Sequence, residues 1–179
     1  MATKTVFTIA DYLELDEPDG PHYELSDGEL IVSPSTTHNH NEVRDRLANR
    51  LRLFSAPARL GVIVCEVDLQ LGPATIRRPD VGFIFAARYK REYGEMVPIP
   101  IAPDLAFEVV SKHDRPAALK KMLPQYLDVG TKAVWLLYPA KGEAHRHVRG
   151  GEPPQVHTRD LIEPALPGFK VPLSELFEI

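Results

Sequence analysis

Apolar residues recur at helical spacing in several segments of the chain. Between residues 41 and 54 they occupy one helical face, at Val43, Leu47, Leu51 and Phe54. Residues 8–15 join a threonine cap to a short amphipathic pattern, and residues 172–179 resemble a last amphipathic turn. These segments are therefore predicted to be helices.

A further helix is expected after residue 111. The segment begins with Ser111 and Asp114 in a Ser-x-x-Asp arrangement, has Pro116 early and ends at Gly130. Pro124 lies inside it, and proline removes a backbone donor and crowds the preceding turn. We expect a kink or a break at this position.

Between the helical segments, alternating or β-branched runs indicate strands. Residues 22–34 alternate around Asp27-Gly28, a pair that permits the positive φ angles of a hairpin turn. The other strand segments are residues 60–72, 80–85, 104–111 and 132–139, and a closing hairpin at 143–161. The order predicts one domain over residues 1–179, of class α/β (α+β), with a central mixed sheet flanked by helices and an N-terminal helix and hairpin.

Composition narrows the class of protein. The chain has 179 residues, of which 44% are hydrophobic and 26% charged, and its apolar runs fall short of the roughly 20 residues that span a bilayer. Its first residues carry acids where a secretory signal would be basic, so a cytoplasmic location without membrane contact is expected. Cys65 is the single cysteine, which excludes an internal disulfide and favours core packing.

The net charge of −4 argues against a surface that wraps a polyanion tightly. The arginines are nevertheless unevenly placed, since one segment carries Arg44, Arg46, Arg50 and Arg52. This group could contact nucleic acid, or it could be a solvated helix face.

Candidate chemistry begins with Glu108, which lies inside the apolar run "LAFEVV". A buried carboxylate costs several kcal/mol unless it is paired, protonated or bound to a metal. Asp104 is on the same strand, but four residues put the two carboxylates roughly 13 Å apart, too far for one cation to bridge. Asp80 starts a separate strand that could lie beside Glu108, about 4.8 Å away.

Two carboxylates on neighbouring strands can share a hard cation. Mg²⁺ and Mn²⁺ prefer such oxygen ligands and contact phosphates, so this arrangement points to metal-assisted phosphodiester hydrolysis. The alternative is purely structural. Asp80 would then pair with Arg77 or Arg78, and Glu108 with a lysine as a buried ion pair.

Four ordered blocks also resemble a known family. "YELSDGELIVSPSTTHNHNEVRDRL", "RRPDVGFI", "FEVVS" and "YLDVGTKAVWLLYP" are similar to the Uma2 family, formerly a domain of unknown function, of the PD-(D/E)xK nuclease superfamily. The resemblance runs from about Tyr12 to Pro139. It implies a restriction-endonuclease-like core with Asp80 and Glu108 as the catalytic acids and metal ligands, the Val109 carbonyl as a third ligand and Glu24 as an accessory acid.

The resemblance also concerns a histidine and a lysine. His40 matches a recurrent family histidine, although from the residues alone a surface or capping role is expected for it. The superfamily lysine would stand at Val110, and in Uma2 relatives it lies four residues before the tyrosine matched by Tyr126, where this chain has Met122. The remaining candidates are Lys121 first, then Lys120 and Lys112; the two on the helix could instead cover its solvent side.

These observations favour a metal-dependent endonuclease that hydrolyses DNA with Mg²⁺ or Mn²⁺. The competing hypothesis is a catalytically silent nuclease-fold protein that binds nucleic acid or assembles as a homodimer. Such a dimer could form through the apolar edge around Val134 to Tyr138. A third hypothesis is a hydrolase of RNA or small phosphodiesters.

Overall fold

The computed structural model describes residues 6–16, 21–33, 35–111 and 114–178. Its helices are α1 (Ile9–Leu13), α2 (His38–Ser55), α3 (Pro116–Leu127) and α4 (Leu173–Phe177), with short 3-10 turns η1 (Arg91–Glu95) and η2 (Pro139–Lys141). Its strands are β1 (His22–Ser26), β2 (Glu29–Ser33), β3 (Gly61–Val64), β4 (Leu69–Gly72), β5 (Thr75–Arg77), β6 (Val81–Phe85), β7 (Leu105–Val109), β8 (Ala133–Tyr138), β9 (Glu143–Val148), β10 (Gly151–His157), β11 (Asp160–Ile162) and β12 (Lys170–Pro172).

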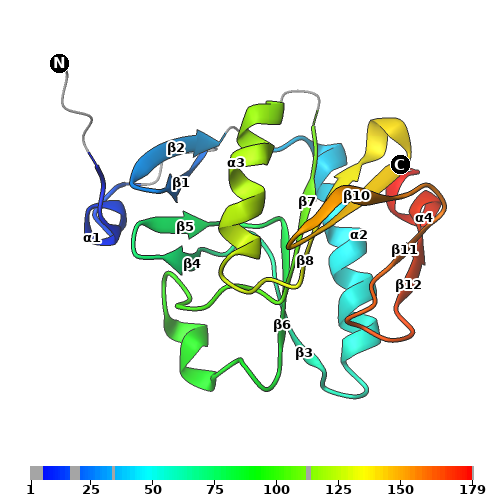
Figure 1. Ribbon diagram of the computed structural model, residues 1–179. Helices are drawn as coiled ribbons and strands as arrows, with labels where there is room; N and C mark the ends of the chain where they lie inside the picture. Colours follow the sequence, from blue (N-terminus) through cyan, green and yellow to red (C-terminus); the bar gives the residue numbers. More distant parts are fainter. Residues whose placement is uncertain (1–5, 17–20, 34, 112–113, 179) are drawn as a thin grey trace.

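The strands form a central mixed sheet and two smaller ones (Figure 1). The central sheet has the order β10-β9-β8-β7-β6-β3, in which only β7 and β8 are parallel. A second sheet has the order β2-β1-β5-β4, and β11 pairs with β12. The predicted class, a mixed sheet flanked by helices with an N-terminal helix and hairpin, is confirmed.

Helices cover both faces of the central sheet (Figure 1). The side chains of β7 alternate, so Phe107 and Val109 pack with the apolar stripe of α2. Ala106 belongs to the opposite face, where it shares a core cluster with Met122 and Tyr126 of α3. By the same alternation Glu108 faces α3, and this orientation is what places it in the candidate site.

Local sequence signals account for the helix starts. Thr8 and Asp11 form a capping box at α1, and Thr37 caps α2 through the backbone N–H of His40. Helix α3 begins later than its Ser-x-x-Asp signal predicts: Arg115 is the N-cap, and Ser111 donates its N–H to Asp114 in the loop before it. Pro124 does not break α3, which continues to Leu127.

Three expectations about the strands need correction. Residues 60–72 are not one strand but two, β3 and β4, in different sheets, because the chain turns between them at Glu66, whose φ is 50°. Strand β5 was not predicted, because its 3 residues are too few to show an alternation of apolar and polar side chains. The apolar run of β8 is not an edge, since β7 and β9 flank it, so the homodimer surface expected around Val134 to Tyr138 is wrong.

Within the described ranges, no helix is both long enough and apolar enough to cross a bilayer.

Candidate nuclease site

Asp80 and Glu108 meet across two neighbouring strands. β6 and β7 are antiparallel with Val81 opposite Phe107, so the residue before Val81 lies beside the residue after Phe107. This register brings together the two acids that strand spacing singled out.

Backbone hydrogen bonds lock the two acids to each other's strands. The N–H of Val109 donates to Asp80 Oδ2 at 2.6 Å, and the N–H of Asp80 donates to Glu108 Oε2 at 3.4 Å. The second of these is long and therefore weak. The geometry fixes Asp80 more firmly than Glu108, whose carboxylate needs a second contact to hold its direction.

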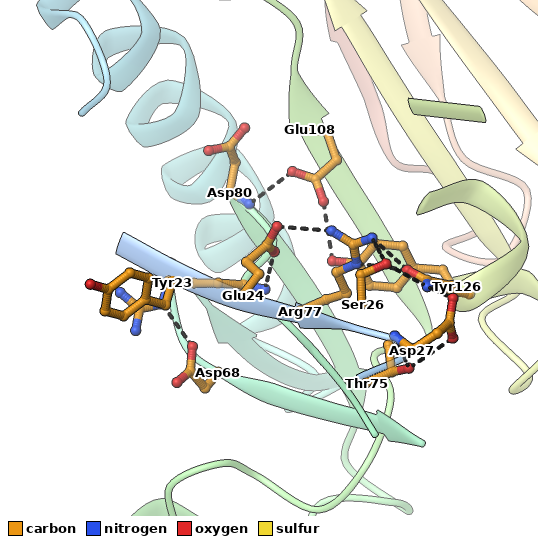
Figure 2. Close-up of polar contacts among 12 residues, drawn as sticks. Tyr23, Glu24, Ser26, Asp27, Asp68, Thr75, Arg77, Asp80, Glu108 and Tyr126 are labelled. Carbon is orange, nitrogen blue, oxygen red and sulfur yellow. Dashed lines mark hydrogen bonds and ion pairs between the residues drawn. The ribbon is translucent and has the colours of Figure 1, made fainter. Parts of the chain in front are cut away.

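That contact comes from helix α3. The hydroxyl of Tyr126 donates to Glu108 Oε1 at 3.1 Å, and the tyrosine is fully buried. Figure 2 shows the Glu108 carboxylate between the backbone of Asp80 and the Tyr126 hydroxyl. Each oxygen of Glu108 therefore accepts one hydrogen bond from the part of the chain that the structure describes.

Glu24 enters the site from β1, in the second sheet. Its Oε2 accepts from Arg77 Nη1 at 2.9 Å, and its Oε1 accepts from the N–H of Arg78 at 2.8 Å. Arg77 is 4% exposed and also donates to Ser26 and Gln125 (Figure 2). Both oxygens of Glu24 are therefore engaged by hydrogen bonds from the chain.

His40 reaches the site from the first turn of α2. Its Nε2 lies 3.2 Å from Asp80 Oδ2, and 11% of its side chain is exposed. Burial lowers the pKa of His40, but the hydrogen bond and the charge of Asp80 outweigh it, so the pKa is raised above its ordinary value. A surface or capping role does not describe this side chain, which contacts a candidate metal ligand.

The charge balance of the site is unfavourable without a cation. Burial raises the pKa of Glu108 well above its ordinary value, and the charges of Asp80 and Glu24 raise it further. The guanidinium of Arg77 is already bound to Glu24. A divalent cation between Asp80 and Glu108 would relieve this crowding of carboxylates.

The donor set fits a Mg²⁺-type ion with few protein ligands. Among the described residues, no group of three or more His, Cys, Asp and Glu side chains could hold a metal, and Glu24 is occupied by Arg77 and Arg78. Mg²⁺ needs only one or two carboxylates, since waters and phosphates complete its sphere.

The candidate ligands have oxygens available for such an ion. In the described part of the chain both contacts of Asp80 fall on Oδ2, which leaves its Oδ1 free. The N–H of Val109 points to Asp80, and in an extended strand the carbonyl of a residue points to the same side as its N–H. The two carboxylates and this carbonyl are the ligands that the chain could offer.

The predicted lysines do not join this cluster. Lys121 and Lys120 are exposed, and Lys121 Nζ pairs with Glu29 Oε2 at 3.0 Å. Lys112 lies outside the described residues. Met122 is 9% exposed and packs on the same face of α3 as Tyr126, one turn away, so the position where the resemblance leads us to expect a lysine carries a thioether. A catalytic role for Lys121 stays a prediction.

The alternative interpretation of Asp80 was an ion pair with Arg77 or Arg78, and both arginines have other partners. Among the described residues, Arg77 pairs with Glu24 and Arg78 pairs with Asp68 at 2.7 Å, so the ion pairs seen for both arginines are to other acids than Asp80. Asp104 accepts from the N–H of Phe85 and pairs with Arg88, which agrees with its exclusion as a ligand.

The arginines of α2 are largely neutralised. Glu66 and Asp45 pair with Arg44, Glu42 with Arg46 and Glu175 with Arg50. The interpretation as a helix face engaged with its own surroundings fits better than a free basic patch.

Tyr126 and Arg77 are the site residues that sequence reasoning did not assign. Tyr126 had a usable signal, since it lies on the apolar face of α3 with a hydroxyl that needs a partner when buried. Arg77 had none, because its burial depends on the pairing of β5 with β1, which the sequence does not reveal.

Comparisons with known proteins identify the family and the fold of the chain. The sequence profile of the Uma2 family, described as "Putative restriction endonuclease", matches residues 9–174. No protein of curated function matches the chain. Among solved structures, a "putative nuclease belonging to DUF820" from Anabaena variabilis superposes with a TM-score of 0.84 at 21% identity, covering 96% of this chain and 98% of its own. That likeness establishes the fold, and the profile match establishes the family: the chain belongs to the Uma2 family.

Proposed function

We propose that the protein is a metal-dependent endonuclease that hydrolyses phosphodiester bonds in DNA. Family membership supports a nuclease-like function. The observation that carries the finer proposal is the pairing of Asp80 with Glu108 across β6 and β7, with Glu24 close enough to raise the pKa of Glu108. Such a cluster of carboxylates can bind a divalent cation, and a bound divalent cation can contact the phosphate of a substrate.

Asp80, Glu108 and the Val109 carbonyl would hold one Mg²⁺ or Mn²⁺. The bound ion would polarise the scissile phosphate and lower the pKa of the attacking water. Glu24 is held by Arg77 and by the N–H of Arg78, and its remaining lone pairs could accept a hydrogen bond from that water. His40 contacts Asp80 through Oδ2, which leaves Oδ1 available for the ion.

A second function is favoured by one observation. Met122 occupies the position at which the family resemblance leads us to expect a lysine, and the neighbouring Lys121 pairs with Glu29. Without a lysine ammonium to stabilise the negative charge that develops on the phosphate in the transition state, the same fold would bind nucleic acid and cut it slowly or not at all.

Plasmid cleavage in Mg²⁺ or Mn²⁺ separates the two functions. Wild type should nick or linearise the plasmid, Asp80→Asn should not, and Asp104→Asn should behave as wild type. Asp104→Asn is the matched control, because it changes the other Pro-Asp aspartate outside the site. Intact plasmid with wild type and Asp80→Asn alike would contradict the endonuclease and leave the binding protein.

A further inference from the structure

Glu108 is the least firmly held of the candidate ligands. Its Oε2 accepts one hydrogen bond from the Asp80 N–H, at 3.4 Å. A hydrogen bond of this length is weak, so with this contact alone the side chain could rotate away from Asp80. A cation site needs the opposite orientation.

The hydroxyl of Tyr126 opposes that rotation. It donates to Oε1 at 3.1 Å, on the side of the carboxylate away from the Asp80 N–H (Figure 2). A phenol O–H is a donor and an ionised carboxylate only an acceptor, so Tyr126 donates in this contact.

The ring of Tyr126 is held in turn by its neighbour in sequence. Gln125 accepts from Arg77 Nε at 2.8 Å and donates to Ser26 and Asp27, so it ties α3 to the second sheet. Since successive residues of a helix point in directions about 100° apart, this attachment leaves Tyr126 facing β7. Two sheets and a helix thus determine where its hydroxyl lies.

We propose that Tyr126 is a positioning residue, whose hydroxyl holds the Glu108 carboxylate in the orientation that binds the cation. The inference rests on the proposed function, because it assigns Tyr126 to the same metal site. Contacts of this kind behind a ligand typically change metal affinity or activity by about 10- to 100-fold. Tyr126→Phe removes the hydroxyl and keeps the buried ring.

The first test is a calorimetric Mn²⁺ titration of wild type, Tyr126→Phe and Tyr12→Phe. Tyr12 is the matched control, since it is also buried and its hydroxyl also contacts a carboxylate, that of Asp68, outside the site. Tyr126→Phe should raise the Kd for Mn²⁺ about 10- to 100-fold, and Tyr12→Phe should leave it unchanged. An unchanged Kd in Tyr126→Phe would overturn the proposal.

A kinetic readout separates positioning from a loss of folding. In cleavage assays kcat of Tyr126→Phe should fall at low Mn²⁺ and recover as Mn²⁺ is raised, with KM for DNA unchanged. A structural defect would not recover with the metal. Loss that persists at saturating Mn²⁺, or a matching loss in Tyr12→Phe, would contradict the assignment.

A metal-free crystal structure of Tyr126→Phe decides the inference independently of cleavage. The Glu108 carboxylate should turn away from the Asp80 N–H while α3 keeps its place. A carboxylate unmoved from its wild-type position would refute the positioning role. Should wild type bind no Mn²⁺, the proposed function fails, and this structure still decides whether Tyr126 orients Glu108.

Discussion

At the scale of single residues, Arg77 is the side chain on which the arrangement of acids depends most. It is 4% exposed and bridges Glu24, Ser26 and Gln125, and thus joins β1, β5 and α3. Removing one partner of a buried ion pair leaves the other charge buried and unpaired. This lowers the free energy of unfolding far more than the loss of a surface pair does. The stability of this region and the position of the Glu24 side chain therefore depend on one guanidinium.

We expect Arg77→Met to lower the free energy of unfolding by about 3 kcal/mol or more. Thermal or urea unfolding measures this change. Arg50→Met is the matched control, because Arg50 pairs with Glu175 on the surface, with about half of each side chain exposed, and such pairs contribute about 1 kcal/mol or less. An equal decrease in the free energy of unfolding in the two variants would show that the buried contacts of Arg77 contribute no more to stability than a surface ion pair.

At the scale of elements, the face of α3 that meets β7 decides whether a lysine ammonium lies near the carboxylates of the site. Met122 and Tyr126 share that face, whereas Lys121 points to Glu29. Lysine at position 122 would extend from a buried position one turn from the Glu108 contact. The carboxylates there would favour its charged form.

Met122→Lys should therefore raise the rate of plasmid cleavage, on the order of 100-fold if the ammonium acts as one preorganised charge. Lys121→Met removes a lysine from the neighbouring exposed position and should leave the rate unchanged. Single-turnover cleavage in Mn²⁺ gives both rates. A fall in Lys121→Met with no gain in Met122→Lys would assign the catalytic lysine to position 121 and contradict the account of this helix face.

Sequence reasoning performed differently on different elements, for physical reasons. The long helix and the hairpin at Asp27-Gly28 were predictable because periodicity and turn chemistry are local. The division of residues 60–72 and the existence of β5 were not, since sheet membership is set by partners distant in sequence. The same limit applies to the site: Asp80 and Glu108 follow from strand spacing, whereas the Arg77 contacts require a second sheet.

At the scale of the whole molecule, charge bears on how a polyanion could approach. The chain carries a net charge of −4, and the described arginines of α2 are engaged by nearby acids apart from Arg52, which contacts Cys65. Three carboxylates stand at the candidate site itself. DNA should therefore be repelled unless divalent cations neutralise the site.

We expect binding of a fluorescent DNA duplex to be weak in EDTA and at least about tenfold tighter in Ca²⁺, which resembles Mg²⁺ in its preference for oxygen ligands. Fluorescence anisotropy measures both affinities. Asp80→Asn should lose the gain from Ca²⁺, which identifies the site as its source. Tight binding in EDTA, equal to that in Ca²⁺, would show that DNA is held by another surface.

The central claim is that Asp80 and Glu108 form one divalent-cation site, and calorimetric titration with Mn²⁺ tests it most directly. Wild type should bind one ion per chain, and both Asp80→Asn and Glu108→Gln should lose that binding while remaining folded by circular dichroism. Binding retained in both variants, or no binding in wild type, would contradict the account.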